Sequence, residues 1–344
     1  MQVDSDSLSE KFSNSENEDE LSETSQSSQD SSFEYGKELE NLQFSSINVN
    51  SHPEGNQKEK TKRSEFECYN FNDLEIIGEG GYCHVKKAYW KSRSKMVALK
   101  NLKPKMISNK GVCEEFIKEA NLLAITCHPN IIKFYGVAKD HDTTSHFLIL
   151  QYANESNLRD YLKRNFNKLK WDRKLNMSLD IAKGLKYLHT DKAIVHRDLH
   201  SKNILVHNGL LKIADFGMST FAGSKLKTTG NGIPAYVDPQ YLKDHNYERN
   251  EKSDIYSFGV LLWEISSGYP PFQHLPGEVE VIYRIFEGKR EIPVKGTPEM
   301  YIKLYSCCWD ETPGIRPDIN EIYEELQRMS VLYKRNQDIQ TKKA

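Results

Sequence analysis

The chain has 344 residues and a formal net charge of −2. This near-neutral balance does not favour nucleic-acid binding, and the length suffices for one or two folded cores. The longest apolar stretch, residues 255–265, is too short to cross a bilayer, and no charged start followed by an apolar core opens the chain. The six cysteines show neither zinc-ligand spacing nor a disulfide framework, which favours reduced thiols. We therefore expect a soluble, cytoplasmic protein that is not inserted in a membrane.

Residues 1–64 differ in composition from the rest of the chain. Before position 51, twelve acidic residues stand against Lys11 and Lys37 alone, and Ser, Asn and Gln supply most of the remainder. Few large apolar residues are available to offset the entropy of ordering, so we expect a disordered, acidic, Ser-rich tail. Its serines could be phosphorylated or could engage a basic partner, but a solvated extension without function is the simpler interpretation.

The chain after the tail reads as two regions of different periodicity. Between residues 73 and 151 the pattern predicts strands near 74–77, 85–90, 96–102, 133–138 and 146–150, with one helix near 112–126. After Asn157 apolar residues recur at steps of three and four, which is typical of helices. We therefore expect an α+β fold with a small, β-rich N-terminal lobe and a larger, α-helical C-terminal lobe.

The segment from Gly78 to Val85 is the first that carries chemistry. Glycines without a Cβ atom let backbone N–H groups approach phosphate oxygens closely, and Gly78 and Gly80 supply this freedom between two expected strands. A β-hairpin without a ligand would be the better reading if this loop stood alone.

The expected strand 97–100 and Glu119 on the following helix carry the next candidate residues. Side chains alternate along a strand, so Ala98 and Lys100 share a face, where Ala98 leaves room for a flat base and Lys100 lies about 6.6 Å further along. An ammonium at that place can reach phosphates. Glu119 shares its helical turn with an apolar face, where a carboxylate is unfavourable unless it is paired, and Lys100 is the natural partner. On its own, Glu119 could equally face solvent.

The most specific segment runs from His196-Arg197-Asp198 to Asn203 and is followed by Asp215-Phe216-Gly217. Asp198 can accept a hydrogen bond from a substrate hydroxyl, while Asn203 and Asp215 offer the hard oxygen ligands that Mg²⁺ prefers. A histidine or aspartate in an arbitrary loop is usually structural. The spacing and order of these segments are very improbable by chance.

Read in order, these segments resemble the eukaryotic protein kinase superfamily. The pattern from Ser253 to Gly259, with Trp309 and Arg316-Pro317, is similar to the tyrosine-kinase and tyrosine-kinase-like branches, and the overall pattern favours the second. The resemblance covers about 70–332 and leaves 333–344 as a short polar tail. It implies the bilobal protein kinase fold, ATP and Mg²⁺ as cofactors, and transfer of the γ-phosphoryl group to Ser/Thr, or else Tyr, hydroxyls of a protein substrate in intracellular signalling.

An alternative is a pseudokinase scaffold that binds nucleotide and partners without catalysis. The presence of Lys100, Asp198, Asn203 and Asp215 argues against it. The substrate, the pathway and the oligomeric state stay open at this point.

The resemblance also implies a role for individual residues. Leu150 would be the gatekeeper, residues 151–153 the hinge that bonds adenine, and Asp254 the anchor of a packed column that joins the lobes through Leu123, Phe134, His196 and Phe216. The implied catalytic set is Asp198, Lys100, Glu119, Asn203 and Asp215, of which Asn203 and Asp215 would hold the metal. The implied nucleotide-binding set is Ile77, Gly78, Gly80, Val85, Ala98, Lys100, Leu150, Gln151, Ala153 and Leu205.

Three departures from the family pattern concern the segment between Gly217 and Gln240, called the activation segment below, and the loop around Asp198. The usual Ala-Pro-Glu reads Asp238-Pro239-Gln240, so we expect the ion pair to Arg316 to become at best a neutral-to-charged hydrogen bond and the segment to dock less firmly. His200 and Ile233 replace the lysine and threonine of Ser/Thr kinases. Lys202 stands where tyrosine kinases often have arginine, so hydroxyl specificity is ambiguous.

Two further expectations concern reactivity and regulation. Cys83 replaces the third glycine of the loop, and positive charge near Lys100 would lower its thiol pKa, although a small tolerated residue is the simpler reading. Kinases with an arginine at the position of Arg197 commonly use it to hold a phosphate on the activation segment, and Thr228 and Thr229 are the best acceptors. The alternative is that these are ordinary exposed loop residues and that the enzyme is constitutively active.

Overall fold

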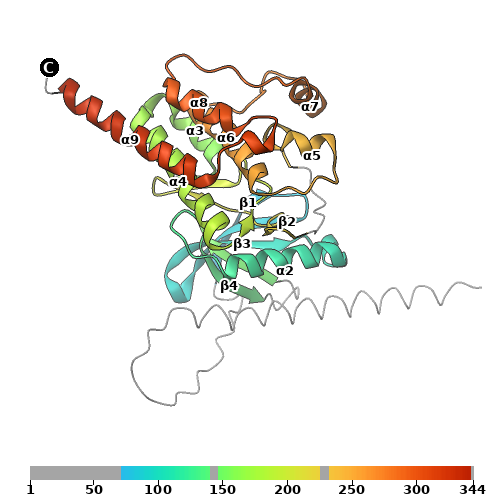
Figure 1. Cartoon of the computed structure of the whole chain (residues 1–344). Helices are drawn as coiled ribbons and strands as arrows, with labels where there is room; N and C mark the ends of the chain where they lie inside the picture. The colour runs from blue at the N-terminus through green and yellow to red at the C-terminus, as the bar shows by residue number, and fades with distance from the viewer. Residues whose placement is uncertain (1–70, 140–145, 225–231, 342–344) are drawn as a thin grey trace, which may run out of the picture.

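The computed structural model describes residues 71–139, 146–224 and 232–341 (Figure 1). The predicted acidic tail and the two predicted phosphate acceptors, Thr228 and Thr229, lie outside these ranges. Within them, no helix is both long enough and apolar enough to cross a membrane.

The N-terminal half is a five-stranded antiparallel sheet in the order β1-β2-β3-β5-β4, accompanied by helix α2 (Figure 1). These elements confirm the five predicted strands and the predicted helix to within a few residues. Helix α2 begins after Asn109, whose side chain accepts the backbone N–H of Val112 as an N-cap. The bounds are β1 Phe71–Glu79, β2 Cys83–Trp90, β3 Lys95–Leu102, α2 Lys110–Ala124, β4 Phe134–Lys139 and β5 His146–Gln151.

The two faces of β3 have different surroundings, as its alternation predicts. Val97 and Leu99 are buried in an apolar cluster on the outer face of the sheet, with Trp90, Phe147 and Ile149 among its members. Lys100 points to the opposite face, toward α2. The strand thereby places a charged group on the side of the sheet that meets the helical half.

The C-terminal half is mainly helical, with two short antiparallel strand pairs, β6 with β9 and β7 with β8. They carry the loop around Asp198 and the start of the activation segment. The bounds are α3 Leu158–Asn165, α4 Trp171–Lys186, β6 Ile194–Val195, β7 Ile204–His207, β8 Leu210–Ile213, β9 Thr220–Phe221, α5 Pro239–Lys243, α6 Glu251–Ser267, α7 Glu278–Phe286, α8 Glu299–Cys308 and α9 Ile319–Thr341.

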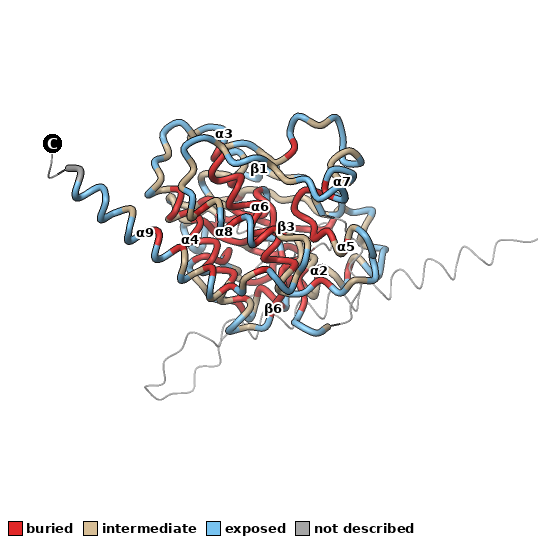
Figure 2. The backbone as a smooth tube through the Cα atoms, turned by 45° about the horizontal axis from the view of Figure 1, so that its top comes forward, coloured by how far each residue is buried: buried red, intermediate tan, exposed pale blue. Residues whose placement is uncertain are grey.

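Helix α6 is the centre of this half, and Figure 2 shows it among the buried parts of the chain. Every residue from Ser253 to Ser267 is buried, which explains why the sequence of this helix is apolar on all sides. Asn250 and Ser253 form a capping box at its start. Helix α9 packs on α4 and continues past Leu332, so residues 333–341, within the segment for which we expected a short polar tail, are helical.

Candidate active site

Lys100 joins three elements that are distant in the sequence. Its Nζ atom lies 2.7 Å from both carboxylate oxygens of Glu119 on α2 and 3.0 Å from Oδ1 of Asp215. The side chains of Lys100 and Glu119 are 10% and 3% exposed, whereas that of Asp215 is 47% exposed. The predicted contact between Lys100 and Glu119 is therefore present, and Asp215 is the most exposed of the three side chains.

The charges in this group support one another. The Lys100 ammonium holds the pKa of the Asp215 carboxyl at about 2, well below its ordinary value. Burial opposes a charge on Lys100, but Asp215 and Glu119 outweigh it and raise the pKa of the ammonium. Burial also raises the pKa of Glu119, and Lys100 counters that shift. The site thus keeps a permanent positive charge next to an ionised, accessible carboxylate.

The loop around Asp198 is tied by Asn203. The Nδ2 atom of Asn203 donates to the backbone oxygen of Asp198 at 2.9 Å and to its Oδ2 atom at 3.0 Å. The amide nitrogen of Asn203 is therefore used within the loop, and its amide oxygen is left as an acceptor. His200 places its Nε2 atom 3.6 Å from the same Oδ2 atom.

Asp254 at the start of α6 supports the backbone of this loop. It is wholly buried and accepts the backbone N–H of His196 at 2.7 Å and that of Arg197 at 2.8 Å. The backbone of Arg197 is left-handed, with φ of 68°, and Asp215 has φ of 65°. Such conformations are strained for residues with a side chain and persist where the surroundings hold them, often at functional sites.

The residues of the predicted column lie in or next to one large apolar cluster. The rings of His196 and Phe216 meet edge to face with centroids 5.2 Å apart. Leu123 and Phe216 belong to one large apolar cluster, and Phe134 packs against it. The backbone anchor that was expected of Asp254 is the pair of hydrogen bonds to His196 and Arg197.

The residues expected to line the nucleotide lie on adjoining strands. In the sheet register Val85 stands opposite both Gly78 and Lys100, and Ala98 stands opposite Leu150. The face expected to receive the adenine and the phosphates is therefore one continuous strip of β1, β2, β3 and β5.

The other expected nucleotide contacts lie around this strip. Ile77 is 44% exposed near the end of β1, and Gly80 donates its N–H to Cys83 across the turn at 2.9 Å. Gln151 ends β5, and Ala153 follows as a partly buried residue. Leu205 lies on β7 and packs against the large apolar cluster.

The donor set fits a magnesium ion. Asn203 offers an amide oxygen and Asp215 an exposed carboxylate, which are the hard oxygen ligands that Mg²⁺ prefers together with phosphate and water. Among the described ranges, no three His, Cys, Asp or Glu side chains gather as a metal-binding group. A two-residue donor set is compatible with Mg²⁺ because this ion usually keeps water and substrate ligands.

The comparisons with known proteins agree with this geometry. The model of the family described as protein tyrosine and serine/threonine kinases matches residues 71–326. The chain belongs to this family. Among its relatives are the probable serine/threonine-protein kinase drkA of Dictyostelium discoideum, 35% identical over 255 residues, and the serine/threonine-protein kinase VIK of Arabidopsis thaliana, 33% identical over 272 residues.

The relatives of this kinase-family chain are longer than the matched part. The alignment with drkA covers 73% of the chain and 38% of drkA, and the alignment with VIK covers 75% and 60%. Mitogen-activated protein kinase kinase kinase 10 of Xenopus laevis is 32% identical, with 76% of the chain and 26% of the relative covered. What the chain shares with these proteins is thus the kinase domain.

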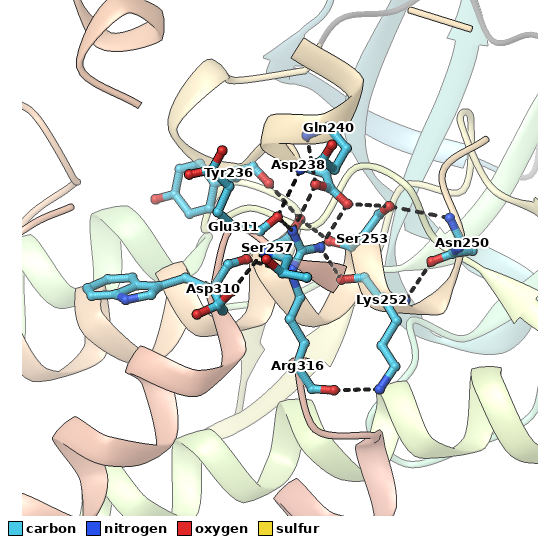
Figure 3. A network of polar contacts seen from close by, with 12 residues as sticks. Tyr236, Asp238, Gln240, Asn250, Lys252, Ser253, Ser257, Asp310, Glu311 and Arg316 are labelled. Atoms are coloured by element: carbon cyan, nitrogen blue, oxygen red, sulfur yellow. Dashed lines mark hydrogen bonds and ion pairs between the residues drawn. The ribbon is translucent and has the colours of Figure 1, made fainter. Parts of the chain in front are cut away.

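The expectation that Gln240 weakens the anchor of the activation segment is wrong, because Asp238 supplies the missing carboxylate (Figure 3). Arg316 binds Asp238 through two hydrogen bonds of 2.8 and 3.0 Å, and both side chains are fully buried. Asp238 also accepts from the hydroxyl of Ser253 at 2.8 Å. Gln240 instead donates to the backbone oxygen of Glu311 at 3.0 Å. The ion pair is kept and has moved by two residues.

Our sequence reasoning missed Asp238 as an anchor, although a signal was present. Asp238 directly precedes Pro239 and is the N-cap of α5, where its side chain accepts the N–H of Gln240 at 3.0 Å. An acidic residue followed by proline at a helix start could have drawn attention to this carboxylate. A second missed feature is Tyr236, whose hydroxyl bonds to Glu264 and accepts from Arg159 at 3.1 Å.

The expectation that Cys83 has a lowered pKa is also wrong. Burial raises the pKa of the Cys83 thiol to about 11, and this effect exceeds the opposite influence of Lys100. The simpler reading, a small residue accepted in place of glycine, agrees with a partly buried side chain that packs against the large apolar cluster.

Proposed function

We propose that the chain is an active, ATP-dependent protein kinase that phosphorylates Ser/Thr hydroxyls and belongs to the tyrosine-kinase-like branch. The observation that carries this proposal is the contact of Lys100 with both Glu119 and Asp215, next to a loop in which Asn203 orients Asp198. A pseudokinase does not need to keep the charged groups of these catalytic residues in contact with one another. The names of the relatives, which are serine/threonine or dual-specificity kinases, favour the same class of activity.

The nucleotide would lie along the strip formed by β1, β2, β3 and β5. Adenine would bind the backbone of residues 151–153, between Ala98 above and Leu205 below, and Lys100 would bind the phosphates. Asn203 and Asp215 would hold Mg²⁺, which supplies charge neutralisation on the phosphate oxygens when it is bound. An ATP and magnesium site agrees with action inside the cell, and we propose a cytoplasmic location.

The reaction needs few groups from the protein. The substrate hydroxyl oxygen attacks the γ-phosphorus, the bond to the bridging β–γ oxygen breaks, and ADP leaves. The hydroxyl proton passes to the carboxylate of Asp198. Positioning and charge stabilisation supply most of the acceleration in reactions of this kind.

The test is phosphoryl transfer from Mg-ATP to the protein itself and to generic substrates, followed by identification of the phosphorylated amino acid. Asp198→Asn should abolish transfer and leave ATP binding largely intact, whereas Asp215→Asn should also weaken the magnesium-dependent binding of ATP. His274→Asn, a change at an exposed position, is the control. Undiminished turnover in purified Asp198→Asn would refute the assignment, and exclusive phosphotyrosine would refute the Ser/Thr specificity.

A further inference from the structure

His200 is held in one tautomer by the loop that carries Asp198. Its side chain is nearly buried, and its Nδ1 atom accepts, at 3.2 Å, the backbone N–H of Asn203, which also donates to the backbone oxygen of His200 at 2.8 Å. A ring nitrogen that accepts a hydrogen bond carries no proton, so a neutral imidazole in this place has its proton on Nε2. The backbone of Asn203 therefore makes the other ring nitrogen a donor.

That donor faces the carboxylate of Asp198. Nε2 of His200 lies 3.6 Å from Oδ2 of Asp198, and the same oxygen accepts from Nδ2 of Asn203 at 3.0 Å. The first distance exceeds a hydrogen bond by about 0.5 Å, and contacts of this kind in ligand-free sites often tighten when substrate binds. Asn203 thus donates to Oδ2, and Nε2 of His200 lies just beyond hydrogen-bond distance of the same oxygen.

The second oxygen of Asp198 faces the activation segment. A Cβ atom on Gly232 would lie 3.0 Å from Oδ1, so the backbone of this residue passes directly beside it. Within residues 71–139, 146–224 and 232–341, Oδ1 has no hydrogen-bond donor of its own. The carboxylate is therefore asymmetric, with one oxygen tied to the loop and the other presented to the segment along which a substrate would pass.

The ring of His200 is also fixed from behind. It meets the ring of Tyr236 edge to face with centroids 6.1 Å apart. The hydroxyl of Tyr236 is bonded to Glu264 on α6 and receives a hydrogen bond from Arg159 on α3. Because Tyr236 is held by two helices, its ring restrains the orientation of the imidazole, with Nε2 directed toward Asp198.

We propose that His200 is a positioning residue for phosphoryl transfer: its Nε2–H, together with Asn203, holds Oδ2 of Asp198 so that Oδ1 receives the substrate hydroxyl. The inference rests on the kinase activity proposed above and assigns a task to a residue that departs from the lysine of Ser/Thr kinases. A histidine is shorter than lysine, so its donor ends at Asp198 and does not extend beyond it.

Two variants separate the two nitrogen atoms of the ring. His200→Gln can place an amide N–H near the position of Nε2, whereas His200→Asn can place an acceptor near Nδ1 but cannot reach Asp198. The same two changes at the exposed His274 are matched controls. Steady-state kinetics with a generic protein substrate give kcat and the KM for ATP, and thermal unfolding reports whether each variant is folded.

We expect His200→Asn to lower kcat by about 10- to 100-fold, the range for a lost hydrogen bond to a charged group, with the KM for ATP unchanged. His200→Gln should keep kcat within about threefold of the wild type. The reverse order, equal kcat values in the two variants, or an effect confined to KM would overturn the proposal. If His200 had only a structural role, it would act through the hydrogen bond of Nδ1 with Asn203. His200→Asn can keep that bond, so its kcat would then exceed that of His200→Gln.

A measurement on the wild-type protein needs neither variant to be active. Long-range ¹H–¹⁵N spectra of ¹⁵N-histidine-labelled protein report the tautomer of each imidazole, and the signal that is absent in His200→Gln is that of His200. We expect a proton on Nε2 only. A proton on Nδ1 would overturn the role of His200 even in an active kinase. An inactive wild-type protein with the expected tautomer would instead refute the proposed activity.

Discussion

The Nζ atom of Lys100 lies at the same distance, 2.7 Å, from both carboxylate oxygens of Glu119. Strand β3 and helix α2 are thereby joined through a pair that is almost fully shielded from water. Active protein kinases make this contact between strand and helix. The third partner, Asp215, places its Oδ1 atom 3.0 Å from the same Nζ atom. The structure therefore combines the strand, the helix and the Asp-Phe-Gly segment in one arrangement.

Removal of the Glu119 charge tests this arrangement. Glu119→Gln should lower the free energy of unfolding by up to about 3 kcal/mol, the low end for breaking a buried pair, because Asp215 still faces the ammonium. It should also lower kcat/KM for ATP. Urea unfolding and steady-state kinetics check this, with the exposed Glu114→Gln as the control. A Glu119→Gln protein as stable as the control would contradict the prediction.

The relocated anchor leads to a second prediction. Asp238→Ala should lower the free energy of unfolding by about 3–5 kcal/mol, because Arg316 would keep its charge in a buried place without its carboxylate. Gln240→Ala should lower it by only about 1 kcal/mol, the value of one neutral hydrogen bond. The double variant Asp238→Leu/Arg316→Met should regain part of the loss. Similar losses in the two single variants would contradict the assignment of the anchor to Asp238.

Thiol labelling tests the environment of Cys83. Because its pKa is raised to about 11, only a very small part of this thiol is ionised at pH 7.5, and the fraction grows as the pH rises toward 11. Iodoacetamide should modify the exposed Cys127 and Cys307 first, and Cys83 slowly. Mass spectrometry of timed digests measures the three rates. Modification of Cys83 ahead of the other two would show that it is an activated thiol.

Gly232 offers a test of the space beside Asp198. With φ of 67° and a Cβ position 3.0 Å from Oδ1 of Asp198, Gly232→Ala should lower kcat by at least about tenfold, since a displaced carboxylate loses its alignment. Backbone strain adds about 1–2 kcal/mol of destabilisation. Gly223→Ala is the matched control, because its φ is 75° and nothing lies within 4 Å of its Cβ position. Equal kcat losses in the two variants would assign the effect to backbone strain.

The predicted phosphate switch depends on Arg197. In the described part of the chain its guanidinium donates to the backbone oxygens of Arg249 at 3.2 Å and Ser224 at 3.3 Å, which places it beside the start of the activation segment. Phosphate on Thr228 or Thr229 should raise kcat through a bidentate contact with Arg197. Phosphatase treatment should therefore lower the activity of the wild type and leave that of Arg197→Ala unchanged. An unchanged wild-type activity would exclude the switch.

Local patterns predicted the fold and the contact of Lys100 with Glu119, because alternation and helical periodicity are short-range properties. The faces of Val97 and Lys100 follow from the period of a strand, and the contact of Lys100 with Glu119 follows from the need of a buried carboxylate for a partner.

Two properties that depend on three-dimensional surroundings were predicted wrongly. The burial that dominates the pKa of Cys83 comes from its packing against the large apolar cluster, which the sequence around Cys83 does not reveal. The Asp238 anchor was missed because only the residue type at position 240 was compared with the family pattern, without regard to nearby carboxylates. The carboxylate that Arg316 needs reaches it from another residue of the same turn.

The two faces of the N-terminal sheet are covered by two different apolar clusters. The outer cluster, with Val97, Leu99 and Trp90, contains residues of the sheet alone, whereas the inner cluster runs from Phe116 and Leu123 into the helical half and includes Phe216. A hinge movement that swings the two halves apart would leave the outer cluster intact and break contacts of the inner one. The outer cluster thus belongs to the small half alone, whereas the inner cluster is shared by both halves and ties the position of one to that of the other.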